Sequence, residues 1–215
     1  GRWYVSFGTE RELAQNPIHP SKTAIGIDLG ISKLITTSNS EVIKPKNSFK
    51  ANQIKLAALQ RQLSRKVLFS QNWKKQNSKI QKLHHHIANI RHDYLHKITT
   101  TISKNHAMIA CEDLKVANMS KSASGSVEKK GKNVKAKSGL NKSILDQGWG
   151  MMVNMLEYKQ QWQGGLLIKV NPRYTSQTCF NCQHIAKENR QTQSEFECVK
   201  CMYVANADVN AARNI

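Results

Sequence analysis

Two pairs of cysteines have the spacing of a metal site. Cys179 and Cys182 form one Cys-x-x-Cys pair, and Cys198 and Cys201 form the second after 15 intervening residues. Structural zinc takes four thiolates in a tetrahedron, and a two-residue spacer lets two sulfurs face one metal from a tight turn. We expect a structural zinc ion here, because the segment has too few apolar residues to fold without metal. The fifth cysteine, Cys111, lies in an apolar run and is expected to be buried.

Three acidic residues stand in segments that are otherwise apolar or built from small residues. Asp28 interrupts an apolar run, Glu112 ends another, and Asp208 lies near the start of the last predicted helix. Alternation along a strand places Asp28 on the same face as Ala24 and Gly26, and these small neighbours would leave room for a ligand. Each acid alone also has an ordinary explanation, as a strand-end group or as a helix N-terminal acid favoured by the helix dipole.

The charge balance indicates a polyanionic partner. Lys and Arg number 33 against 14 Asp and Glu, which gives a formal net charge of +19. Residues 44–104 carry 14 basic side chains and one acidic side chain, and residues 115–142 carry eight basic and one acidic. Such zones bind phosphates and release counterions, although solvated helix faces are the alternative explanation. Beside phosphates, acids held together favour two Mg²⁺ ions about 4 Å apart, which would neutralise the carboxylates and clamp a scissile phosphate.

The strands that must position the acids follow from short apolar runs. Residues 23–30, 33–38 and 41–44 predict adjacent antiparallel strands. Residues 106–114 and 166–170 predict two further strands, which return the chain to the same sheet. Asp28 and Glu112 would therefore lie on strands, and Asp208 on a helix.

Helices are expected between and after these strands. Apolar residues at spacings of three and four predict two basic helices, the first marked by Leu56, Leu59, Leu63 and Val67, the second running from Ile80 to Ile102. Residues 117–140, rich in Ser, Gly and Lys, are expected to be a mobile loop. A helix through Trp149 should end near Gly164, and residues 205–215 should form the last helix.

Three segments resemble, in order, the RuvC motifs of the TnpB (OrfB) family of transposon-encoded RNA-guided nucleases. They are Gly26-Ile-Asp28-Leu-Gly30, Ala110-Cys-Glu112-Asp-Leu114 and Ala207-Asp208-Val-Asn210-Ala-Ala. The segment Pro172-Arg-Tyr-Thr-Ser-Gln177, ahead of the cysteine pairs, is similar to the zinc-ribbon segment of that family, and Gly1-Arg2-Trp3-Tyr4-Val5 resembles the last strand of its wedge domain.

This resemblance implies an α/β fold of the RNase H-like (RuvC) type: a mixed sheet with an inserted basic helical hairpin and an inserted four-cysteine zinc ribbon. Asp28, Glu112 and Asp208 would hold catalytic Mg²⁺ or Mn²⁺ and hydrolyse phosphodiesters as an endodeoxyribonuclease. It also implies a guide RNA from the transposon end that pairs with the DNA target. In that scheme the basic loop resembles a lid over the site.

The domain boundaries expected from these features are as follows. Residues 1–20 would be the end of a wedge-like domain, including a strand at residues 2–8, and a linker. Residues 21–175 would form the nuclease core, with the helical insertion at about 48–104 and the basic loop at about 115–140. Residues 176–204 would form the zinc ribbon, and residues 205–215 the last RuvC motif and C-terminal helix. Most of the wedge domain and the whole recognition domain of the family would precede residue 1.

The basic zones supply the expected nucleic-acid contacts. These are Lys55, Arg61, Arg65, Lys74, Lys75, Lys79, Arg91, Lys129, Lys130 and Arg173. The expected partners are a DNA target and a guide RNA, with no membrane association, because no apolar run is long enough to span a bilayer. The chain is expected to be a monomer or weak dimer in the bacterial cytoplasm, associated with the nucleoid.

Two other functions remain open from the sequence. The chain could be a truncated remnant that binds nucleic acid without cutting it, because part of the family's protein would be missing. It could also be a structure-selective resolvase that uses the same three acids, Asp28, Glu112 and Asp208, without a guide. The intact acids argue against mere binding, since a module that does not cut has no need of carboxylates beside phosphates.

Overall fold

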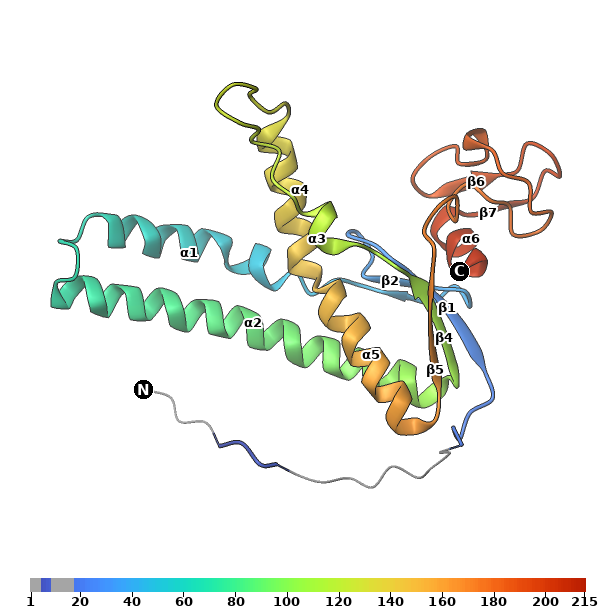
Figure 1. The fold of residues 1–215 in the computed structure, drawn as a ribbon, viewed down its shortest axis with the longest axis horizontal. Coiled ribbons are helices and arrows are strands. Elements are labelled where there is room, and N and C mark those ends of the chain that lie inside the picture. The colour runs from blue at the N-terminus through green and yellow to red at the C-terminus, as the bar shows by residue number, and fades with distance from the viewer. Residues whose placement is uncertain (1–4, 9–17) are drawn as a thin grey trace.

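The structure, a computed structural model, describes residues 5–8 and 18–215 (Figure 1). Residues 1–4, which hold the first three positions of the strand expected at residues 2–8, and residues 9–17, in the expected linker, lie outside the described residues. Residues 5–8 have no regular secondary structure, so the expected strand over residues 2–8 is wrong in this part. Within the described residues, no helix is both long enough and apolar enough to cross a membrane.

A five-stranded mixed sheet forms the centre of the fold. Its order is β3-β2-β1-β4-β5, with β1 antiparallel to β2, β2 antiparallel to β3, and β1, β4 and β5 mutually parallel. The strands are β1 Ala24–Leu29, β2 Ile35–Thr37, β3 Val42–Ile43, β4 Met108–Glu112 and β5 Leu166–Val170. All five strands expected between residues 23 and 170 are present, and the first three pair as predicted.

The buried face of β1 anchors the main core. Ile25, Ile27 and Leu29 alternate with less buried residues and pack with the helices that cover this face. Cys111 on β4 is completely buried in the same cluster, as expected. The opposite face of β1 carries Asp28, so the period of two directs the acid away from the core.

Two long helices form a hairpin that extends away from the sheet (Figure 1). They are α1 Ser48–Ser64 and α2 Gln71–Asn105, where the sequence predicts the helical insertion. A small apolar cluster, which includes Leu56 and Ile80, joins the two helices. The C-terminal half of α2 packs on α5 Trp149–Gln163. Val67 does not belong to the apolar stripe as expected, because it lies in the turn and is 79% exposed.

The segment that was expected to be a loop through residue 140 is partly helical. It contains the short helix α3 Val116–Met119 and the beginning of α4 Val134–Gln147. Polar side chains tie the two together: Lys137 donates to the carbonyl of Met119 at 2.6 Å, and Asn141 donates to that of Ser120 at 2.8 Å. The expected loop is wrong here because polar side chains hold the start of α4. Such contacts, unlike a buried apolar face, produce no helical spacing of apolar residues in the sequence.

Glycines end the helices on either side of α5. Gly148, with φ 72°, separates α4 from α5, so the helix expected through Trp149 is two helices. Gly164, with φ 73°, terminates α5 where the sequence predicts the end. This left-handed backbone conformation is readily available to glycine and is common at helix C-termini.

The C-terminal part forms a small second unit of structure. A 3₁₀ turn, η1 Lys187–Asn189, precedes a two-stranded antiparallel sheet of β6 Glu195–Glu197 and β7 Val204–Asn206. The chain then enters α6 Ala207–Asn214, and Asn206 caps this helix by accepting from the N–H groups of Asp208 and Val209. Because α6 contacts both β1 and β6, it connects the cysteine-rich segment to the main sheet.

A buried carboxylate fixes the base of the hairpin. Asp146 on α4 accepts hydrogen bonds from the backbone N–H groups of Phe49 (2.9 Å) and Lys50 (3.1 Å) and from the Ser48 hydroxyl (3.2 Å), while the Arg91 guanidinium lies 3.5 Å away. Its side chain is only 3% exposed. The carboxylate thus caps the N-terminus of α1 from another helix.

Replacing this carboxylate should destabilise the fold. We expect Asp146→Ala to lower the free energy of unfolding in urea by about 2–4 kcal/mol, since Arg91 and two backbone N–H groups lose a buried partner. Asp93→Ala is the matched control, because Asp93 is 63% exposed and pairs with Lys97 on the same helix. Its loss should stay below about 0.5 kcal/mol, and equal losses for the two variants would contradict the role of Asp146.

Candidate functional site

The register of the sheet brings two of the three acids together. Ile27 pairs with Cys111 in the parallel ladder of β1 and β4, so the next residues, Asp28 and Glu112, are neighbours at the carboxyl ends of the strands. The third acid, Asp208, comes from the first turn of α6. All three line one cavity of about 340 Å³. Convergence, which periodicity alone did not show, is therefore a feature of the structure.

The close approach of α6 to β1 depends on Gly26. A Cβ atom on Gly26 would lie 2.1 Å from the carbonyl oxygen of Ala212, which is closer than any real contact. The space over Gly26 is thus filled by the backbone of α6, which corrects the interpretation of Gly26 above, and the cavity opens beside Asp28 instead. The small residue admits the helix that carries Asp208.

Burial raises the pKa of two of the acids, Asp28 and Glu112, and at Asp28 the charges of the other acids add to the effect. Burial, and then the charges of Glu112 and Asp208, raise the pKa of Asp28 to about 7, although the charge of Arg190 acts in the opposite direction. Burial also raises the pKa of Glu112, while the hydroxyl of Thr175, which donates to Glu112 Oε1 at 2.6 Å, lowers it. A site that resists ionisation in this way is ready for cations.

Two basic side chains that no sequence pattern indicated face Asp208. Lys33 Nζ lies 2.8 Å from Asp208 Oδ2, and the Arg190 guanidinium lies 3.6 Å from Oδ1. Both line the cavity of the acids. Lys33 precedes β2 and Arg190 follows η1, so neither forms a local pattern with Asp208. A basic residue between the cysteine pairs was the only available signal for Arg190.

Asn210, in the last of the three motifs, holds α6 in place. Its side chain is completely buried, accepts from the N–H of Phe180 at 3.0 Å and donates to the carbonyl of Thr178 at 2.8 Å. These bonds hold α6 against the segment that begins the first cysteine pair. The position of Asp208 is therefore coupled to the cysteine-rich segment.

The four cysteines converge as the spacing predicts. Their Sγ atoms all lie within 4.8 Å of one another, with 3.7 Å between Cys179 and Cys201 and 3.6 Å between Cys182 and Cys198. Sulfurs around tetrahedral zinc, with Zn–S bonds of about 2.3 Å, lie about 3.8 Å apart, whereas a disulfide would need about 2 Å. A hydrogen bond from the backbone of Tyr203 lowers the pKa of the Cys201 thiol to about 6, whereas burial raises the pKa of the Cys179 thiol.

The expected nucleic-acid contacts fall into three groups. Six lie exposed on the α1–α2 hairpin: Lys55, Arg61, Arg65, Lys74, Lys75 and Lys79. Lys129, Lys130 and Arg173 are exposed elsewhere, and Arg173 lies over the ring of Tyr174, 4.8 Å from its centroid. Arg91 differs, because it is half-buried and bonded to Asp146 and to the Leu145 carbonyl, so it serves the packing of α2 on α4.

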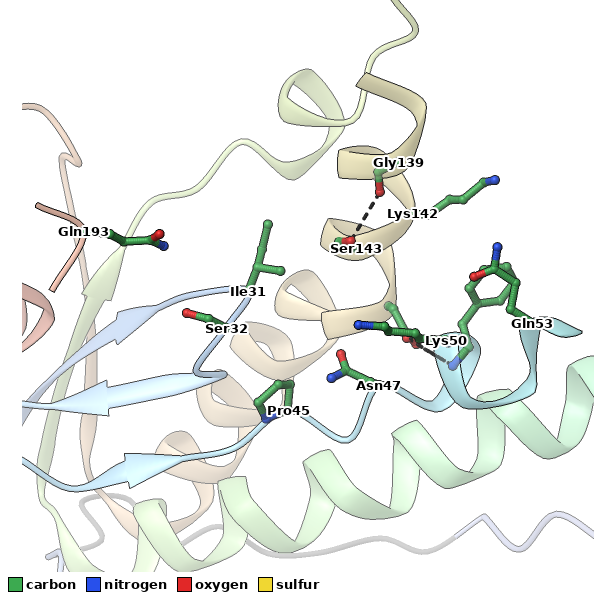
Figure 2. A pocket seen from close by; sticks show the side chains of 12 residues that line it. Ile31, Ser32, Pro45, Asn47, Lys50, Gln53, Gly139, Lys142, Ser143 and Gln193 are labelled. Carbon is green, nitrogen blue, oxygen red and sulfur yellow. Dashed lines mark hydrogen bonds between the residues drawn. The ribbon is translucent and has the colours of Figure 1, made fainter. Parts of the chain in front are cut away.

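A second, larger cavity adjoins that of the acids (Figure 2). Its volume is about 710 Å³, and it shares Ile31, Ser32 and Gln193 with the first cavity. Lys142 on α4 and Lys50 on α1 also line it. Figure 2 shows Gln193 on the side opposite the two helices. The two cavities therefore adjoin over shared residues, and the second is flanked by cationic and amide side chains.

The chain is similar to known proteins over most of its length. The family model of OrfB_IS605, described as a probable transposase, matches residues 6–123, and that of the Cas12f1-like TNB domain matches residues 149–215. A protein of Escherichia coli (strain K12), "Putative RNA-guided DNA endonuclease InsQ", is 62% identical over the whole chain. "TnpB-like protein L79" of Acanthamoeba polyphaga mimivirus is 24% identical over the whole chain, which covers 40% of that protein.

A solved structure supports the fold. The "Cryo-EM structure of the Cas12f1-sgRNA-target DNA complex" contains a chain that matches 89% of this chain with a TM-score of 0.57 at 23% identity, over 48% of its own length. The fold of the chain is thus similar to that of the corresponding part of the Cas12f1 chain. The chain belongs to the OrfB family of transposases, also called TnpB. It spans 53% of the length of the Escherichia coli relative.

The raised pKa of Asp28 predicts a pH-dependent cost to stability. Its carboxyl has a folded pKa of about 7 and an unfolded pKa near 4, so the folded state loses stability as pH rises from about 4 to about 7 and the loss then levels off. We expect Asp28→Asn to raise the free energy of unfolding by about 2–4 kcal/mol at pH 8 without divalent metal, and to change it little at pH 4.

Thermal unfolding across this pH range measures the effect. Asp113→Asn is the matched control, because Asp113 lies beside Glu112 in sequence but is exposed and paired with Lys115. A gain for Asp28→Asn that is independent of pH, or equal for the two variants, would show that repulsion and burial at Asp28 are not the cause.

Proposed function

We propose that the chain is the nuclease part of a transposon-encoded, RNA-guided DNA endonuclease. Asp28, Glu112 and Asp208 would bind Mg²⁺ or Mn²⁺ and hydrolyse a phosphodiester of the target DNA. The RNase H-like (RuvC) assignment of the mixed sheet, the domain boundaries given above and a cytoplasmic, nucleoid-associated location belong to the same proposal. The guide RNA and the DNA target are its partners, because relatives are named as RNA-guided DNA endonucleases.

The observation that carries the proposal is the convergence of three acids from three elements on one cavity. A strand-end cap or a helix N-terminal acid would explain one carboxylate, but neither explains why β1, β4 and α6 direct theirs to the same space. The cost of holding them together is visible in the raised pKa of Asp28. Such costs are retained at functional sites.

The residues present fit divalent cations. Carboxylate oxygens are the ligands that Mg²⁺ and Mn²⁺ prefer. The basic side chains that lie against the acids, Lys33 and Arg190, both pair with Asp208. Bound there, such ions would supply an activated water and stabilise charge on the phosphate. Thr175 orients Glu112, and Lys33 holds Asp208, so the chain itself fixes the directions of two of the three carboxylates.

The surroundings fit a polynucleotide substrate. The larger cavity adjoins that of the acids and is lined by Lys50 and Lys142, whose charges would neutralise phosphates next to the scissile bond (Figure 2). The hairpin adds exposed cations further along. The four cysteines would hold structural zinc, which keeps α6 and therefore Asp208 in place through Asn210.

Cleavage assays test the proposal. The purified chain would be incubated with labelled single-stranded DNA and Mg²⁺ or Mn²⁺, with and without transposon-end RNA. We expect metal-dependent cleavage that Asp28→Ala reduces to background, since no other group in the cavity replaces its oxygens. Asp113→Ala, which removes an exposed neighbour of Glu112, should cleave as the unsubstituted chain does.

The outcomes separate the alternatives. Cleavage that needs the RNA supports the guided nuclease, whereas the same cleavage without RNA supports a structure-selective resolvase. Tight binding with no cleavage under any of these conditions would favour a module that binds nucleic acid without cutting it.

A further inference from the structure

The tip of the α1–α2 hairpin exposes apolar side chains to solvent. Val67, Leu68 and Phe69 are 79%, 63% and 68% exposed in the turn that joins the helices. The hairpin carries them to the end of the molecule opposite the sheet (Figure 1). Within the described residues, the ring of Phe69 contacts Trp73 edge-on, with centroids 5.5 Å apart and an interplanar angle of 62°. This geometry leaves the phenylalanine ring largely uncovered.

The backbone presents this ring at a cost. Phe69 has φ 60°, in the left-handed region that glycine and asparagine occupy more easily than an aromatic residue. The next residue, Ser70, then caps α2 by accepting from the N–H of Trp73. Glycine or asparagine at position 69 would allow the same turn, so the turn itself does not explain the choice of phenylalanine. Strain of this kind is typical of functional positions.

The surroundings of the ring are strongly cationic. Arg65, Lys66, Lys74 and Lys75 flank it, and no acidic residue occurs in the sequence between Glu41 and Asp93. In the part of the chain that the structure describes, none of these four cations has an acidic partner. The tip thus combines an exposed aromatic ring with four unpaired positive charges.

This combination fits a polynucleotide better than a protein. The centre of a protein interface is depleted in charge, and burying these cations there would be costly. A single-stranded nucleic acid instead needs a ring on which a base can stack and cations along its backbone. A fully paired duplex offers phosphates but no free base face. The exposed aromatic ring therefore favours unpaired nucleotides over a duplex.

We propose that the hairpin tip is a binding site for an unpaired stretch of polynucleotide, in which a base stacks on Phe69 while Arg65, Lys66, Lys74 and Lys75 hold the adjacent phosphates. The site is independent of the acids: α1 has 17 residues and rises about 25 Å between its base, near the larger cavity, and the tip. RNA and single-stranded DNA share the chemistry required, so the test includes both.

Fluorescent strands carrying 2-aminopurine provide the test, because stacking on an aromatic ring quenches this base. Affinity and quenching would be measured for the full chain with single-stranded RNA, single-stranded DNA and a blunt duplex of the same sequence. We expect Phe69→Ala and Phe69→Leu to weaken single-strand binding by about 10-fold and to abolish the added quenching, and Phe69→Trp to retain both. Duplex binding should not change.

Matched controls separate stacking from charge and from folding. Ile54→Ala removes a side chain that is 85% exposed on the same hairpin and should have no effect. The double variant Arg65→Ala/Lys66→Ala should lower the salt dependence of binding by about 0.7 per charge removed, whereas the Phe69 variants leave it unchanged. An effect with RNA, with DNA or with both supports the site and identifies its ligand.

Three results would overturn the proposal. Phe69→Leu could bind as tightly as phenylalanine does, which would show that the aromatic ring is not used. Phe69→Ala could weaken duplex and single strand equally. Finally, Phe69→Ala could leave all nucleic acids unaffected but alter the oligomeric state of the chain, which would make the tip a protein contact. Because Asp28 is untouched, each result is distinguishable from failure of the proposed nuclease.

Discussion

The contact between the backbone of α6 and Gly26 on β1 determines where the third acid lies. A side chain at this position would lie 2.1 Å from the carbonyl of Ala212, so the helix can reach the sheet only over glycine. Asp208 arrives beside Asp28 and Glu112 because of that approach. Asn210 fixes the other side of α6 to the cysteine-rich segment. The strands, the helix and the cysteines are thus parts of one support for three carboxylates.

The acidic and the basic side chains of the chain are concentrated in different places. The acids are gathered into one cavity, where burial and repulsion raise the pKa of Asp28, while the hairpin and the segment around α4 carry most of the excess positive charge. Lys33 and Arg190 are the basic groups that face the acids directly. This separation suits a polyanionic substrate that must be held by cations and brought close to carboxylates.

The sequence predicted the elements with buried faces and missed those without them. β1, β4 and β5 were predicted because their apolar runs are short and continuous, and the hairpin because Leu56 and Ile80 follow a helical period. The start of α4 was missed because Lys137 and Asn141 hold it through backbone carbonyls. A strand was predicted at residues 2–8, but residues 5–8 have no regular secondary structure.

The site divides in the same way. Spacing was sufficient for the cysteines, whose sulfurs gather as expected, and motif order was sufficient to propose the three acids. Lys33 lies 175 residues from Asp208, so no local pattern could have revealed their contact. Gly26 was interpreted as room for a ligand because a sequence cannot tell which atoms fill the space beside a small residue.

Crystals of the chain grown with Mn²⁺, measured by anomalous diffraction at the manganese and zinc edges, would test the central claim most directly. The account predicts manganese between Asp28, Glu112 and Asp208, with Lys33 moved away from Asp208, and one zinc among the four cysteines. A cavity without manganese at saturating Mn²⁺, with Lys33 still 2.8 Å from Asp208, would contradict it. The three acids would then be a structural cluster that Lys33 neutralises.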